Sequence, residues 1–212
     1  MSDPAIVNYH SNVRHDVLPH VPRGGTLLDL GGGDGATATE VRRQGLADRV
    51  GVVDMVEPAP GSKLDFNYQG DLTQDGFIEK IGEEQGPFDT ILTLDILEHL
   101  EDPWTMVRRL HQQLKPGGVI VSSVPNVRHR SVTVPLLLGN KWQYRDSGIL
   151  DRTHLRFFVK KTAIELMTSS GLTLESVALL PSGGRIDRTL VKLPIINTFS
   201  ALQFAIRVRR DD

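Results

Sequence analysis

The chain has 212 residues, 39% of them hydrophobic and 24% charged, which is enough apolar material for one buried core. A formal net charge of -2 provides no field that attracts polyanions, so we expect neither a nucleic-acid nor a membrane partner. The absence of cysteine excludes thiolate chemistry, which leaves oxygen and nitrogen groups. No apolar run approaches the ~20 residues of a membrane span, and the polar first residues favour a cytoplasmic protein.

Short β-branched runs alternate with amphipathic segments over about residues 25–126, which predicts a parallel sheet covered by helices on both faces. An N-terminal helix is expected before them, over about residues 8–22. The predicted strands are TLLDL, RVGVVDM, FDTILTL and GGVIVSSV. The predicted helices are ATATEVRRQGL and DPWTMVRRLHQQL, and the second begins with an Asp-Pro pair typical of a helix start.

Residues 127–160 lack a regular period, and we predict that they form a substrate-side insertion. A helix, KTAIELMTSSG, and two strands, LTLESVALL and ALQFAIRVRR, are predicted in the C-terminal part, residues 161–210. The run VPLLL is open to three readings, namely burial, an amphipathic lid or a contact in a homodimer. Because no repeat or linker interrupts the pattern, residues 1–212 are expected to form a single domain.

The stretch LLDLGGGDG places four glycines directly after an apolar strand. Glycines between a strand and a helix allow positive φ angles and let a ligand lie against the backbone at the helix start. The spacing differs from the G-x-G-x-x-G of dinucleotide-binding enzymes, which disfavours a nicotinamide-dependent oxidoreductase. An acidic residue at the end of the second strand would bind ribose hydroxyls, and Asp54 is the candidate, with Glu57 as a nearby rival.

With these motifs the sequence resembles the class I S-adenosylmethionine-dependent methyltransferases, through LLDLGGGDG, GVVDM, YQGDL, FDTILTLDILEHLEDP and LKPGG. The resemblance implies an α/β, Rossmann-like fold, with a seven-stranded, mostly parallel sheet, helices on both faces and an antiparallel last strand. It also implies S-adenosylmethionine as cofactor and S-adenosylhomocysteine as product. The residues that it places at the cofactor are Asp29, Gly31, Gly33, Gly35, Asp54, Met55, Asp71, Leu72 and Asp95. A turn residue after Gly70 is the alternative reading of Asp71.

A hydroxyl acceptor needs a base or a metal ion, because a sugar hydroxyl is a very weak acid. The EHL element resembles that of small-RNA 2′-O-methyltransferases and ubiquinone-pathway O-methyltransferases, which implies a divalent ion such as magnesium. Carried over, its ligands would be Asp95, Glu98, His99 and His154. The alternatives are that Glu98 and His99 only stabilise the loop before the next helix, and that His154, paired with Asp151, is a structural histidine. We predict catalytic roles for His154, His99 and Asp151.

The segment GILDRTHLRFF resembles a bacterial branch of the family with a GxLDxTHxRFF-type signature, found among glycan and antibiotic biosynthesis enzymes. That resemblance implies O-methylation of a small-molecule acceptor, namely a sugar or a glycosylated natural product. Four aromatic residues suit stacking on such an acceptor or a place in the core: Trp142, Tyr144, Phe157 and Phe158. Two rivals remain, methylation of a phenol, amine or other molecule and a non-catalytic S-adenosylmethionine-binding pathway protein.

Overall fold

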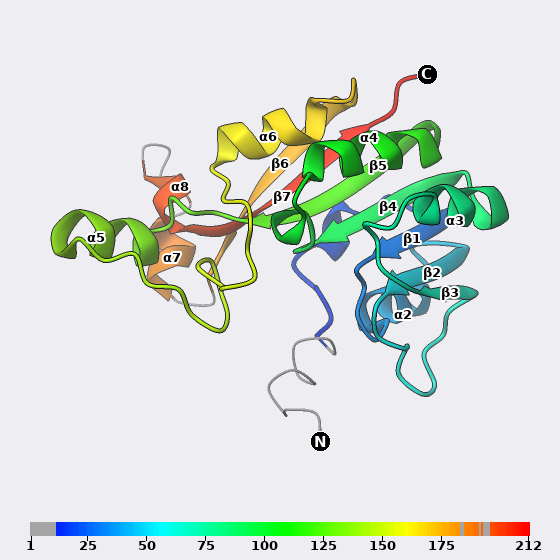
Figure 1. The fold of residues 1–212 in the computed structure, drawn as a ribbon, viewed down its shortest axis with the longest axis horizontal. Coiled ribbons are helices and arrows are strands. Elements are labelled where there is room, and N and C mark those ends of the chain that lie inside the picture. Colours follow the sequence, from blue (N-terminus) through cyan, green and yellow to red (C-terminus); the bar gives the residue numbers. More distant parts are fainter. Residues whose placement is uncertain (1–11, 183–184, 191, 193–195) are drawn as a thin grey trace.

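A computed structural model describes residues 12–182, 185–190, 192 and 196–212 of the chain. Seven strands form one sheet in the order β3-β2-β1-β4-β5-β7-β6 (Figure 1). β1 to β5 pair in parallel, whereas β7 runs antiparallel to both β5 and β6. The predicted Rossmann-like sheet with an antiparallel last strand is therefore confirmed.

The strands are β1 (Thr26–Leu30), β2 (Arg49–Asp54), β3 (Phe66–Gln69), β4 (Phe88–Leu94), β5 (Leu114–Pro125), β6 (Thr173–Pro181) and β7 (Ala201–Arg209). The α-helices are α2 (Ala36–Arg43), α3 (Phe77–Gln85), α4 (Pro103–Gln113), α5 (Arg130–Gly139), α6 (Lys160–Thr168), α7 (Arg185–Leu190) and α8 (Asn197–Ser200). Two short 3-10 helices are η1 (Leu18–His20) and η2 (Leu97–His99). Among the described residues, none of the helices has the length and apolar character needed to cross a bilayer.

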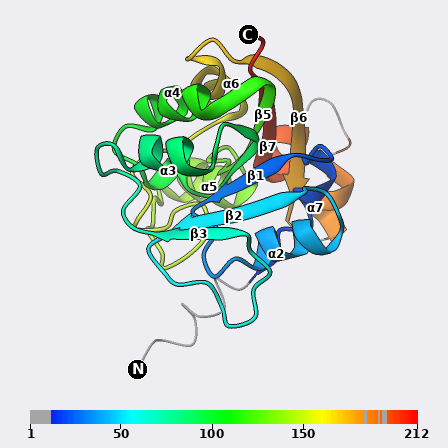
Figure 2. The same cartoon turned by 90° about the vertical axis from the view of Figure 1, so that its right-hand side faces the viewer.

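Both faces of the central strands are buried, so neighbouring residues of one strand pack into different clusters. Leu28 faces the larger cluster, to which α3, α4 and α6 contribute, while Leu27 faces a second cluster that includes Val41 of α2. Figure 2 shows α3, α4 and α6 on one side of the sheet and α2 on the other. This double coverage explains why the parallel strands read as continuous apolar runs rather than as alternating ones.

The N-terminal segment differs from the helix expected over about residues 8–22. Within its described part the chain forms turns and then η1, which is only three residues long; residues 8–11 lie outside the described residues. Val17, Leu18 and Val21 are nevertheless buried, and they pack in the cluster of Leu27. Pro19 and Pro22 have no backbone N–H for the hydrogen bonds of a helix, so the segment packs on the sheet without forming an α-helix.

The edge formed by the carboxyl ends of the parallel strands positions the candidate site. After β1 the chain adds β2 and β3 on one side of β1, and it then adds β4 and β5 on the other side. The order of strands in the sheet therefore reverses between β1 and β4. Ligands of open α/β sheets bind outside the strand ends at such a reversal. The glycine loop follows β1, and Asp95 follows β4.

Candidate active site

The glycine loop after β1 adopts the backbone conformations that favour glycine. Gly31, Gly33 and Gly35 have φ angles of 70°, 58° and 86°. A Cβ on Gly31 would lie 2.1 Å from Cγ1 of Ile96, so the loop passes directly against the segment that follows β4. Gly33 donates its N–H to Oδ2 of Asp54 at 2.8 Å, which ties the loop to the end of β2.

We expect Gly31→Ala to lower the free energy of unfolding by about 2–4 kcal/mol, because it adds an unfavourable φ to a steric clash. Gly45→Ala is the matched control. Gly45 also has a positive φ of 63°, but a Cβ there would meet no atom within 4 Å, so about 1 kcal/mol is expected. Urea unfolding of both variants measures the difference. Equal losses would show that Ile96 moves aside at no cost.

Asp29 lies beneath the glycine loop as a buried carboxylate. Its side chain is almost completely buried, and Oδ2 has no hydrogen-bond partner among the described residues. Burial, together with the charge of Asp54, raises the pKa of Asp29 from 3.8 to about 7. Asp29 and Gly31 to Gly33 line a cavity of about 150 Å³, which is where the sequence places the cofactor.

The other residues predicted at the cofactor follow β2 and β3. Asp54 uses one carboxylate oxygen for Gly33 and the other for the N–H of Val56, and both oxygens keep lone pairs for hydroxyl groups. Met55 is 70% exposed and free to cover a flat ring. Oδ1 of Asp71 accepts from the N–H and hydroxyl of Thr73, as in the turn that was the alternative reading, while the side chain of Leu72 is buried in the core.

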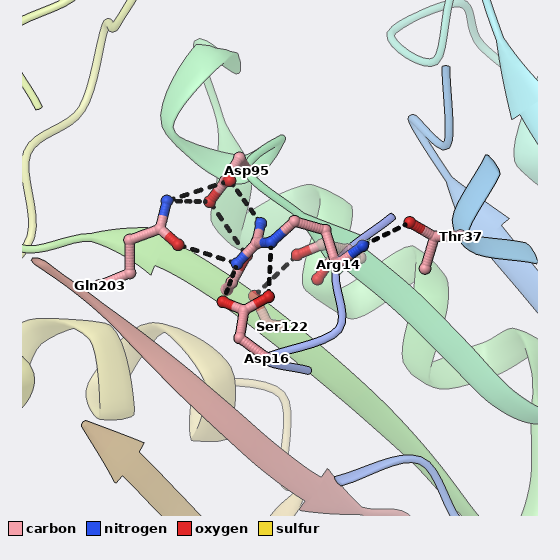
Figure 3. Close-up of polar contacts among 8 residues, drawn as sticks. Arg14, Asp16, Thr37, Asp95, Ser122 and Gln203 are labelled. Carbon is pink, nitrogen blue, oxygen red and sulfur yellow. Dashed lines mark hydrogen bonds and ion pairs between the residues drawn. The ribbon is translucent and has the colours of Figure 1, made fainter. Parts of the chain in front are cut away.

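Asp95, which the sequence places among the metal ligands, forms an ion pair with Arg14 in the structure. Its φ of 55° turns the chain at the end of β4, so Asp95 lies outside the short helix η2 that carries Glu98 and His99. The carboxylate accepts hydrogen bonds from Nη1 of Arg14 at 2.6 Å and from Nε2 of Gln203 at 3.0 Å (Figure 3). It also accepts one from the hydroxyl of Ser123 at 2.9 Å. The Asp95 carboxylate is therefore held by an ion pair, and the group of candidate ligand atoms that the structure brings together does not include it.

Arg14 and Gln203 are functional candidates that the sequence did not predict. Arg14 also bonds Oε1 of Gln203 at 2.8 Å, and its backbone N–H donates to the hydroxyl of Thr37, as Figure 3 shows. The cluster thus joins the N-terminal segment, the end of β4, the start of α2 and β7. Neither residue belongs to a local motif, and no signal in the sequence relates one to the other.

Glu98 is the least satisfied charged group at this edge. It lies in η2 with no exposed surface, and neither carboxylate oxygen has a hydrogen-bond partner within the described part of the chain. Burial, and then the charge of Asp95, raises the pKa of Glu98 well above its ordinary value. An unpaired buried carboxylate is costly, so the arrangement calls for a proton or a cation.

Two histidines complete the cluster with Glu98. Ligand atoms of Glu98, His99 and His154 all lie within 4.8 Å of one another, and the two imidazole rings are 4.7 Å apart. Nδ1 of His154 lies 3.0 Å from the carbonyl of Ile149, and Nδ1 of His99 lies 3.3 Å from that of Thr153. Each Nδ1–H donates to its carbonyl in this arrangement, which leaves Nε2 with a free lone pair.

Burial, followed by the charge of His154, lowers the pKa of His99, which favours the neutral ring that a metal ion requires. The backbone brings the second histidine into place: the carbonyl of Glu98 accepts the N–H groups of Leu155 and Arg156 at 2.8 and 3.0 Å. Three of the four predicted metal ligands are thus brought together, and this donor set of nitrogen and oxygen suits a divalent ion.

The expected pairing of Asp151 with His154 is not formed. Oδ1 of Asp151 accepts from the N–H and hydroxyl of Thr153 at 2.8 and 2.7 Å, so the carboxylate shapes the turn that presents His154.

The aromatic candidates divide between the core and the surface, as the two alternatives allowed. Phe158 is buried in the core, whereas Phe157 lies 5.5 Å from the half-exposed ring of Trp142 and 6.4 Å from that of Tyr144.

Asp95 separates two cavities that open at this edge. The first, with the glycine loop, has been described; the second has about 100 Å³ and is lined by Asp95, Glu98 and His154 among others. A ligand in the first cavity and a ligand in the second would therefore meet at Asp95. This geometry suits transfer of a group between two bound molecules.

A sequence profile described as a methyltransferase domain matches residues 9–177. Two proteins named ubiquinone biosynthesis O-methyltransferase are each 32% identical to the chain. The Caulobacter vibrioides protein aligns over 48% of this chain and 41% of its own length, and the Escherichia coli O139:H28 protein over 51% and 46%. The chain spans less than half the length of these curated relatives.

Solved structures share the fold. An S-adenosylmethionine-dependent methyltransferase from Mesorhizobium loti aligns with a TM-score of 0.61 and 17% identity, over 92% of this chain and 96% of that chain. The N-methyltransferase NodS from Bradyrhizobium japonicum, in complex with S-adenosyl-L-homocysteine, aligns with a TM-score of 0.58 and 16% identity, over 100% and 90%. At these identities the likeness concerns the fold alone.

Proposed function

We propose that this chain transfers the methyl group of S-adenosylmethionine to a hydroxyl of a sugar or glycosylated natural product. The chain belongs to the methyltransferase domain family. The observation that carries the proposal is the position of Asp95 between two cavities, one at the glycine loop and one at Glu98 and His154. The sulfonium cofactor supplies an electrophilic methyl group, so the chain's main task is to align the hydroxyl with it.

The glycine loop fits the cofactor. Its backbone is open to the cavity at Gly31 to Gly33, and the exposed face of Met55 and the spare lone pairs of Asp54 suit an adenine ring and ribose hydroxyls. Oδ1 of Asp71 is used by Thr73, which leaves Oδ2 to accept from an adenine amine. The cavity lined by Asp29 and Asp95 would hold the methionine end of the cofactor.

We assign a divalent cation to Glu98, His99 and His154, because a cation held by these three side chains would neutralise the buried, unpaired carboxylate of Glu98. When bound, the cation supplies a Lewis acid that lowers the pKa of the acceptor hydroxyl. The carbonyls of Ile149 and Thr153 orient the two rings, and the Asp151 turn holds His154 in place. In the metal-free alternative, Nε2 of His154 accepts the hydroxyl proton during transfer.

The sugar acceptor is supported by the surroundings of the second cavity. Gly148, Asp151 and His154 of the signature segment line that cavity, and the half-exposed rings of Trp142 and Tyr144 lie beside Phe157. Aromatic faces of this kind stack on sugar rings. The relatives named O-methyltransferases support an oxygen acceptor, and they also keep a phenol as the principal rival.

Transfer of labelled methyl from S-adenosylmethionine tests the proposal. The acceptor panel consists of nucleotide sugars, deoxysugar glycosides, phenols and amines, each assayed with EDTA and with added magnesium or manganese. We expect label on a sugar hydroxyl that disappears with EDTA and returns with the metal ion. Label that survives EDTA would exclude a role for the cation in transfer. His154→Ala should then reduce transfer about 100-fold or more.

Two other results would contradict the proposed acceptor. Label on phenols or amines but on no sugar would identify a different substrate class for the same reaction. Tight binding of S-adenosylhomocysteine without transfer to any acceptor would support the non-catalytic rival. Calorimetric binding of S-adenosylhomocysteine, measured first, separates a failed cofactor site from a missing acceptor.

A further inference from the structure

A larger cavity lies next to the 100 Å³ cavity of Glu98 and His154, between α5 and the loop that follows it. It has a volume of about 580 Å³, within the range of small-molecule sites. Its apolar wall includes Val132, Val134 and Leu138 of α5, together with Leu150. Figure 1 shows α5 projecting from the end of the sheet, so this cavity is built outside the cofactor-binding core.

The two cavities share part of their walls. Gly148, Ile149 and Leu202 line both the 580 Å³ cavity and the 100 Å³ cavity at Glu98 and His154. Gly148 has a φ of 85°, and a Cβ there would meet no atom within 4 Å, so no packed side chain occupies the space beside its Cα. Because the two cavities adjoin at these three residues, a single ligand that occupied both would contact them.

The larger cavity also carries a net positive charge. Lys141 and Arg145 are among its lining residues, and none of the residues that line it is acidic. Neither side chain forms an ion pair with another described residue. An apolar wall with two unpaired cations favours a ligand that has both an apolar body and an anionic group.

We propose that the 580 Å³ cavity binds the apolar body of the acceptor, with a carboxylate or phosphate of the acceptor at Lys141 and Arg145. The hydroxyl-bearing sugar then reaches into the cavity of Glu98 and His154. This inference rests on the proposed function, since it identifies the acceptor as an acidic, amphipathic glycoside. It assigns the apolar surface of α5 that faces the cavity to substrate, rather than to a second copy of the chain.

Direct binding of four glycosides tests the inference without turnover. The chain has two tryptophans, so Trp104→Phe leaves Trp142, which stands between the lining residues Lys141 and Gln143, as the only tryptophan reporter. The probes are octyl glucoside, octyl glucuronide, octyl glucoside 6-phosphate and methyl glucuronide, used below their micelle concentrations. We expect an octyl acid to bind at least tenfold more tightly than octyl glucoside, and no saturable binding of methyl glucuronide. The preferred acid distinguishes a carboxylate from a phosphate.

Paired variants locate the binding. Val134→Asp, in the cavity wall, should abolish binding of the octyl probes. Leu137→Asp lies on the same helix but is 79% exposed and does not line the cavity, so it should bind them as the parent does. Lys141→Gln combined with Arg145→Gln should reduce the preference for octyl acids to within twofold, with octyl glucoside binding unchanged.

Equal behaviour of the Val134 and Leu137 variants, or equal binding of charged and neutral octyl probes, would overturn the inference. So would failure of all probes to bind, and in that case sedimentation shows whether Val134→Asp disrupts a dimer that covers the cavity. Saturable binding without methyl transfer to any sugar would instead contradict the proposed function and leave the cavity as a ligand site. The two failures are therefore distinguishable.

Discussion

Glu98→Gln is expected to reduce methyl transfer about 100-fold or more, because it removes the only carboxylate of the proposed cation site while keeping its shape. The same change removes a buried charge whose oxygens are unpaired, so the metal-free variant should be at least as stable as the parent. Calorimetry with manganese should show loss of metal binding, whereas binding of S-adenosylhomocysteine should remain. The combination of lost activity with retained stability is specific to a ligand.

Glu101→Gln provides the matched control. Glu101 lies three residues further along the same segment, but its side chain is exposed. We expect this variant to retain activity, metal binding and stability. If Glu98→Gln keeps its metal affinity, or if it loses stability to the same extent as activity, Glu98 has a structural role and the cation assignment is wrong.

The second large effect concerns Asp29 and pH. Its pKa is raised by burial from 3.8 in the unfolded chain to about 7 in the folded one. The protonated carboxyl therefore favours the folded state, and its contribution is fully present below about pH 4 and is lost as pH rises through 7. Between pH 5 and pH 8 this loss corresponds to about 3 kcal/mol.

Asp29→Asn should abolish that part of the pH dependence, since the amide stays neutral throughout. Without cofactor, the free energy of unfolding of the variant minus that of the parent should increase by about 3 kcal/mol as pH increases from 5 to 8. Urea unfolding at several pH values measures this. Asp34→Asn, which changes a partly exposed carboxyl of the same loop, is the matched control for the loss of a carboxyl group there. A constant difference between Asp29→Asn and parent would show that Asp29 is ionised at pH 5.

The sequence predicted the parts of this edge that depend on local chemistry. The glycines after β1 and the acidic end of β2 are short-range patterns. The alternation of strands and helices predicted the parallel part of the sheet, and the family resemblance implied its antiparallel last strand, both of which the structure confirms. Two of the elements that it missed, β3 and α5, have weak periodic signals. β3 is four residues long, and α5 contains Pro135 within an apolar run, so neither has a clear period.

The errors within the site arise from single residues. A positive φ at Asp95 turns the chain at the end of β4, and regular helical spacing cannot anticipate a change confined to one residue. The bond of Asp151 to Thr153 replaces the expected pair with His154 because the nearest donors are two residues away along the chain. Arg14 and Gln203 could not be predicted, since their relation exists only in the folded chain.

The junction of Arg14, Asp95 and Gln203 also bears on when the site can form during folding. Arg14 and Gln203 are separated by 189 positions, so the pair closes a loop that includes most of the chain. Contacts of such high order form late, after local elements have assembled. During synthesis, a nascent chain that has not yet released β7 holds the glycine loop and β4 but leaves the Asp95 carboxylate without its glutamine partner. The proposed site is thus complete only when the last strand enters the sheet.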